Sequence, residues 1–222
     1  NFAFIDDHFD YHTATDIPAN LDENTLAHQG SYLVPLLNYF SNADLSDLNS
    51  GEDNIYFSFP IFEMICYPFS WIFPMLILGC ILFMGLLFYG FRTDKLRIKA
   101  IADGFIPMLI SLIISAVLTF LMWKACLMIY PGYSEMEHGF TYNGYWYIAA
   151  MLFLTLTFNF MVYHQFREPE RQAGYMVFPI LFWLIICIVL AFILPGTGYF
   201  IIPAIFAILQ LSLMIIQKEP NP

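Results

Sequence analysis

The chain has 222 residues, of which 59% are hydrophobic and 12% charged, and its mean hydropathy is +0.66. These values exclude a soluble domain and predict an integral membrane protein. The formal net charge is −10, and residues 1–66 contain eleven Asp or Glu and no Lys or Arg. Because such a segment cannot neutralise a phosphate backbone, we expect no nucleic-acid partner; cations and metal ions are compatible with it.

The chain begins without Met, and residues 1–30 lack the basic, then apolar, then small-residue order of a signal peptide. Residues 1–5 predict a buried β-strand that is entered partway. One strand and one helix cannot enclose a core. We therefore expect residues 1–42 to be the C-terminal end of a larger, truncated α/β domain, and both ends of the sequence to be fragment boundaries.

A helix is predicted after Asp22 or Asn20, either of which can cap it, and it should run to about Asn42. Its apolar positions recur at helical spacing at Leu26, Leu33, Leu36, Leu37 and Phe40. Pro35 falls inside this pattern and predicts a kink. Residues 43–66 are expected to form a polar linker followed by a segment, 55–66, that lies along the outer membrane surface.

Five apolar stretches follow, each about the ~20 residues that a helix needs to cross ~30 Å of hydrocarbon. They are residues 67–91, 105–130, 144–164, 175–194 and 199–216, and a polar tail, 217–222, comes after them. Four prolines fall early in the spans, where the first helical turn has spare donors: Pro74, Pro107, Pro179 and Pro203.

The basic residues of the connectors all fall after the first, third and fifth spans: Arg92, Lys95, Arg97, Lys99, Arg167, Arg171 and Lys218. By the positive-inside rule this face is cytoplasmic, so residues 1–66 lie on the opposite face and the tail is cytoplasmic. Short connectors favour a bacterial inner membrane with residues 1–66 in the periplasm. In a eukaryote the same layout predicts a vacuolar or reticulum membrane with a lumenal N-terminal part.

Two kinds of residue in or beside the spans are candidates for chemistry. Lys124 is the one basic residue within a span, and such a charge is a functional candidate, although a lysine near a span end more often anchors its helix by snorkelling. Four widely spaced cysteines, Cys66, Cys80, Cys126 and Cys187, lack the paired spacing of a metal site. We expect them to be small buried hydrophobic residues rather than zinc ligands or disulfides.

His12 is the leading candidate for a metal ligand, because it follows a predicted strand end on a short turn, and neutral imidazole binds zinc well. Asp16 could accept the proton of the other ring nitrogen, the usual task of a carboxylate beside a ligating histidine. Spacing alone leaves a hydrogen-bonded loop as the alternative. His28, on the predicted helix, is expected to be a surface residue.

The longer string Phe9-Asp10-Tyr11-His12-Thr13-Ala14-Thr15-Asp16-Ile17-Pro18-Ala19-Asn20-Leu21-Asp22 resembles the C-terminal motif of metallopeptidase family 28, the zinc aminopeptidases and glutaminyl cyclases. In that motif an aromatic-His-Ser/Thr-x-x-Asp turn precedes Asn-Leu-Asp and the last helix of the domain. The resemblance covers about the first forty residues. Some members, the vacuolar and endoplasmic reticulum membrane metallopeptidases, join a lumenal peptidase domain to a multi-span C-terminal region.

The resemblance implies a site with two zinc ions in which His12 is the last metal ligand and Asp16 supports it. The other ligands and the general base lie upstream in the family, so no catalytic residue is expected within these 222 residues, and the chain alone should be inactive. The implied substrate is a peptide. The fold class is a mainly α membrane protein, with about five transmembrane helices preceded by the last strand and helix of an α/β zinc-peptidase domain.

A second reading of the same residues is a transport or scaffold protein in which the five spans act and the outer domain is a catalytically inactive peptidase-like module. Neither reading assigns an oligomeric state. The two differ in where the chemistry lies: at His12 in the first, and among the spans in the second.

Overall fold

The structure is a computed structural model of the chain, and it describes residues 10, 14–47, 51–59, 63–136, 140–166, 168 and 171–216. His12, the strand predicted over residues 1–5 and the tail 217–222 lie outside the described residues. Two compact units are distinguished: Asn1–Ser50 with Gly132–Tyr147, and Gly51–Pro131 with Ile148–Pro222. The described residues form six α-helices and one two-stranded sheet.

Helix α1, Glu23–Phe40, confirms the helix predicted before the membrane. The Asp22 carboxylate caps it by accepting hydrogen bonds from the backbone N–H groups of Asn24 and Thr25 at 3.2 and 3.1 Å. Pro35 lies within α1 without ending it. None of the residues of α1 is buried, so its apolar stripe is not covered by the described residues.

An antiparallel hairpin of β1, Asn54–Phe59, and β2, Glu63–Pro68, includes the segment 55–66, for which we expected a position along the membrane surface and predicted no strand. The two strands pair Ile55 with Tyr67 and Phe57 with Ile65. In β1 the buried Ile55 and the half-buried Phe57 alternate with the exposed Tyr56 and Ser58, which is the period of a strand. Ile55, only 1% exposed, anchors the hairpin.

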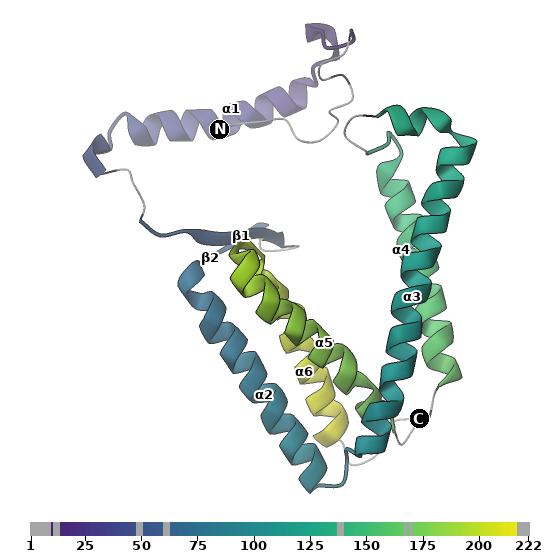
Figure 1. Cartoon of the computed structure of the whole chain (residues 1–222). Coiled ribbons are helices and arrows are strands. Elements are labelled where there is room, and N and C mark those ends of the chain that lie inside the picture. The colour runs from purple at the N-terminus through teal and green to yellow at the C-terminus, as the bar shows by residue number, and fades with distance from the viewer. Residues whose placement is uncertain are drawn as a thin grey trace. The chain divides into compact units, whose positions relative to one another are not determined.

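Five helices are long and apolar enough to cross a membrane, and they indicate an integral multi-pass membrane protein (Figure 1). Their bounds are Ile72–Arg92 (α2), Ile98–Ile129 (α3), Gly144–Gln165 (α4), Gln172–Ile193 (α5) and Ile201–Ile216 (α6). The number of spans and their order are as predicted. The first and last of the spans are lengthened by short 3-10 turns, Phe69–Trp71 and Pro195–Phe200.

Several helix starts differ from the predicted spans: α2 begins at Ile72 rather than at residue 67, which belongs to β2, and α6 begins at Ile201 rather than at residue 199. Helix α3 begins at Ile98 rather than at residue 105, and α5 begins at Gln172 rather than at residue 175. Hydropathy marks where a helix meets hydrocarbon, whereas the helix itself continues into the polar interface. Pro107 and Pro179 consequently lie in helix interiors and not in first turns, which corrects the expectation for these two prolines.

The second compact unit, Gly51–Pro131 with Ile148–Pro222, is called the membrane unit below. Its core lies where α2, α5 and α6 pack side by side, and Figure 1 shows these three helices as one group. Gly198, in the turn before α6, lies at the end of this group that adjoins the hairpin: a Cβ atom there would lie 2.5 Å from Ile55 Cδ1 and 2.9 Å from Ile72 Cγ1. Cys187 is buried in this core as predicted. Cys66, on β2, is exposed, so the expectation of burial is wrong for that residue.

Helices α3 and α5 cross at close range through small residues. A Cβ atom on Gly104 of α3 would lie 2.7 Å from Tyr175 Cα, and one on Gly174 of α5 would lie 2.8 Å from the Ala100 side chain. Such contacts require the absence of side chains, which is the usual way in which membrane helices approach each other closely. The crossing lies near the start of both helices and fixes their basic ends together.

Candidate functional site

The turn that precedes α1 holds Asp16, the predicted support for a metal ligand. Asp16 is exposed and lies between Thr15 and Ile17, whose backbone N–H donates to the Thr15 carbonyl at 2.8 Å. The Asn20 side-chain amide donates to the same carbonyl at 2.8 Å. The segment between residues 15 and 20 is therefore closed on itself by hydrogen bonds. The relation of Asp16 to His12 is untested, because His12 is outside the described residues.

The Asp22 carboxylate, at the end of the family-like string, has a structural task. The Thr25 hydroxyl donates to it at 2.6 Å, and this bond, followed by those from the backbone N–H groups of Asn24 and Thr25, lowers the pKa of Asp22 below its ordinary value. Asp22 therefore belongs to the helix cap. Among the residues that the structure describes, no group of three or more His, Cys, Asp or Glu could hold a metal ion.

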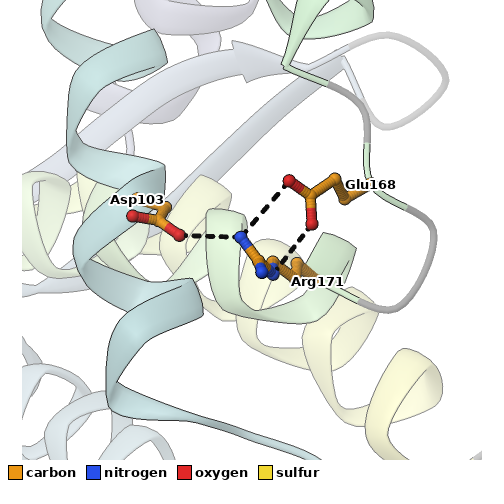
Figure 2. A network of polar contacts seen from close by, with 3 residues as sticks. All are labelled: Asp103, Glu168 and Arg171. Atoms are coloured by element: carbon orange, nitrogen blue, oxygen red, sulfur yellow. Dashed lines mark hydrogen bonds and ion pairs between the residues drawn. The ribbon is translucent and has the colours of Figure 1, made fainter.

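At the basic face of the membrane unit, Arg171 joins two carboxylates from different parts of the chain. Its Nη1 lies 2.9 Å from Asp103 Oδ2, and its Nε lies 2.9 Å from Glu168 Oε2, as Figure 2 shows. The bond to Asp103 connects the start of α5 to α3, one turn from the contact between Gly174 and Ala100. This triad thus reinforces a helix crossing that is already close.

Polar side chains deeper in the spans make local contacts. The Ser115 hydroxyl of α3 donates to the Asn159 side-chain oxygen of α4 at 3.3 Å, so it joins two helices as such groups commonly do. Lys124 is exposed, and its Nζ lies 5.6 Å from the centre of the Phe120 ring. A lysine over an aromatic ring near a helix end fits the anchoring alternative better than a place on a transport path.

A cavity of about 1090 Å³ lies among α4, α5 and α6. Its wall on α5 extends from Gln172 to Trp183, and its wall on α6 extends in the opposite direction from Met214 to Pro203. Eleven residues separate the ends of each wall, which corresponds to about 16 Å at ~1.5 Å per residue. The cavity therefore reaches through about half of a ~30 Å hydrocarbon layer, the depth of one leaflet.

The two ends of this cavity differ in polarity. His164, in the last turn of α4, and Gln172, the first residue of α5, both line the cavity at the end that belongs to the basic face. No hydrogen bond engages the side chain of either residue within the described part of the chain. At the deep end Trp183 donates to the Phe200 carbonyl at 2.8 Å and so presents only its aromatic surface. The cavity is thus apolar along its length and has hydrogen-bonding groups at one end.

In comparisons with known proteins, no family model matches the chain, and neither a curated protein nor a solved structure matches it.

The cavity does not include Asp16 or Lys124, and the predicted metal ligand His12 is outside the described residues. Among the predicted residues, Asp16 stands on an exposed turn and Lys124 does not line the cavity. The cavity residues His164 and Gln172 were not singled out from the sequence, since each is one polar residue at the edge of a long apolar run. A usable signal existed in their placement, because both flank the same basic connector, residues 166–171.

Proposed function

We propose that the chain is the membrane-embedded C-terminal part of a zinc-dependent exopeptidase of the aminopeptidase type, acting on peptides at the non-cytoplasmic face. The observation that supports it is the string from Phe9 to Asp22, with His12 at the position of the family's last zinc ligand. The start of α1 is consistent with it, since α1 begins directly after Asn20-Leu21-Asp22, where that motif places the last helix of the peptidase domain.

In this proposal His12 binds one of two zinc ions through a ring nitrogen, and Asp16 holds the imidazole in the tautomer that leaves that nitrogen free. The zinc pair would polarise the scissile carbonyl and lower the pKa of a bound water. The remaining ligands and the general base belong to sequence that is not among these 222 residues. The distribution of basic connectors supports a periplasmic or lumenal position for residues 1–66.

The test is aminopeptidase activity of the protein expressed from its complete gene, measured with and without a chelator, together with zinc content. We expect Asp16→Asn to weaken zinc binding by about 10–100-fold, the usual effect of losing a group that orients a ligand. His12→Ala should cost more than that in both zinc content and activity. His28→Ala is the matched control, because His28 is exposed on α1 and contacts Tyr32 at 2.6 Å, and it should leave both readouts unchanged.

Full activity and full zinc content in His12→Ala would remove the proposed role of His12. A protein that binds no zinc and releases no amino acid, while folding normally, would instead favour the second candidate, a transport or scaffold protein with an inactive outer module. The specific observation in favour of that candidate is the cavity among α4, α5 and α6. A substrate flux that Lys124→Met abolishes would support its transport form.

A further inference from the structure

We propose that the cavity among α4, α5 and α6 is a binding site for one phospholipid of the leaflet on the basic face, with an acyl chain inside the cavity and the phosphate at His164 and Gln172. This inference does not depend on exopeptidase activity. It concerns the membrane unit alone, where every residue of the cavity wall lies.

The depth of the cavity is the first argument for this occupant. The walls on α5 and α6 run antiparallel from Gln172 and Met214 at the basic end to Trp183 and Pro203 at the deep end. This length of about 16 Å matches one leaflet of a ~30 Å hydrocarbon layer. An acyl chain that enters from the same leaflet would therefore fill the cavity from the interface to the membrane midplane without leaving hydrocarbon.

The lining is the second argument. The deep wall consists of apolar side chains, among them Pro179, Ile180 and Trp183 of α5 and Pro203 and Ala204 of α6. At about 1090 Å³ the cavity is slightly larger than the ~300–1,000 Å³ range of small-molecule pockets. A long apolar chain suits this volume and lining.

The polar end is the third argument. The His164 imidazole and the Gln172 amide can each donate a hydrogen bond, and neither is used by another group within the described residues. Phosphate oxygens are strong acceptors, and the connector between the two residues adds Arg167 and Arg171 to the sequence at this face. Arg171 itself is held by Asp103 and Glu168, so the donors assigned to the phosphate are His164 and Gln172.

The experiment uses the whole chain, purified in detergent and examined by native mass spectrometry after addition of phosphatidylglycerol. We expect one retained phospholipid in the wild type. Ala207→Phe, which inserts a ring from the α6 wall, should lower retention by about tenfold, the effect of displacing a well-packed apolar group. Ala116→Phe is the control, because Ala116 is exposed on α3 and does not line the cavity, and it should retain the lipid.

Fluorescence of Trp183, which lines the cavity, tests whether the lipid binds there. In a variant in which Trp71, Trp123 and Trp146 are Phe, a phospholipid brominated on its acyl chain should quench Trp183 fluorescence, and Ala207→Phe should remove most of that quenching. Met176→Phe gives a second blocked cavity if Ala207→Phe does not fold. Equal retention and equal quenching in folded wild-type and blocked proteins would overturn the site.

The headgroup is tested with diacylglycerol, which has the chains but no phosphate. The wild type should prefer the phospholipid by about threefold to tenfold, corresponding to one or two net hydrogen bonds. Combined His164→Ala and Gln172→Ala should abolish this preference while an acyl chain still quenches Trp183. A wild type that binds both lipids equally would overturn the assignment of the phosphate to His164 and Gln172.

Discussion

Helices α1 and α5 have similar lengths, 18 and 22 residues, and both have apolar faces, yet they differ in how much of that face other residues cover. No residue of α1 is buried, whereas seven residues of α5 are buried against α2, α3 and α6. Periodicity predicts that a segment is helical in both cases, but it does not identify what covers the apolar face. Substitutions in the membrane unit should therefore change stability strongly, and substitutions in α1 should act only locally.

The largest effect is expected at Ile55, where the hairpin packs against the turn that precedes α6. Ile55→Ala should lower the free energy of unfolding by about 2–5 kcal/mol, because it empties a site that is 99% covered and in contact with Gly198. Thermal unfolding of the purified protein in detergent measures this loss. Tyr56→Ala, at a neighbouring position that is 71% exposed, should change the midpoint little. Equal losses in the two variants would mean that the hairpin is not anchored through Ile55.

The next effect concerns the crossing of α3 and α5. Gly104→Ala and Gly174→Ala should each destabilise the protein by about 1–3 kcal/mol, because the added Cβ atoms would meet backbone or Ala100 atoms at 2.7 to 2.8 Å. Gly85→Ala in α2 is the control, for which we expect a change in the free energy of unfolding of opposite sign. Nothing lies within 4 Å of its Cβ position, so the substitution should stabilise by about 0.4–1 kcal/mol. Destabilisation by all three would show that helical glycines here act through something other than close packing.

A smaller effect is expected from the ion pair of Arg171 and Asp103. Both side chains are about one-third exposed, so solvent screens the pair. A double-mutant cycle with Arg171→Gln and Asp103→Asn should give a coupling energy of about 0.2–1 kcal/mol that falls as salt is raised. A coupling well above this range, insensitive to salt, would place the pair in a drier environment than its exposure indicates.

The sequence predicted the spans far better than their packing. Five apolar runs located five helices, because a helix in hydrocarbon must be continuously apolar, but the same uniformity hides which face meets a neighbour. Gly104 and Gly174 have no distinguishing pattern until α3 and α5 are placed together. The early start of α3 at Ile98 is not predicted for a related reason. The helix extends beyond its apolar stretch, 105–130, into residues that are partly polar.

The two candidate sites, the motif around His12 and the cavity among α4, α5 and α6, also differ in whether the sequence can predict them. A short polar motif can suggest His12 and Asp16, because a resemblance depends on residue types in order and not on packing. The cavity could not be predicted, because it is formed by three helices whose lining residues, such as Phe160, Ile180 and Pro203, are ordinary members of apolar runs. Only the pair His164 and Gln172, on either side of one basic connector, was available as a sequence signal.

The smallest effect is expected in α1, and it provides the clearest contrast with α5. Leu37 is 70% exposed, so Leu37→Ala should leave the unfolding midpoint unchanged. Asp22→Ala removes the cap and should speed amide exchange severalfold in the first turn of α1 only. Asp22→Asn keeps the hydrogen-bonding oxygen but not the charge, and it should have a smaller effect.

Lowering the pH protonates Asp22 and so tests the role of the cap without a mutation. The hydrogen bond from Thr25, and then those from the Asn24 and Thr25 backbone, lower the pKa of Asp22 in the folded helix below its ordinary value of 3.8. The cap therefore contributes fully above that value, and its contribution is lost as the pH falls through the lowered pKa. Once the pH dependence of intrinsic amide exchange is divided out, the protection factors of the first-turn amides of α1 should fall over this acid range in the wild type but not in Asp22→Asn. If a global loss of structure accompanied it, α1 would be coupled to the membrane unit, and the contrast with α5 would fail.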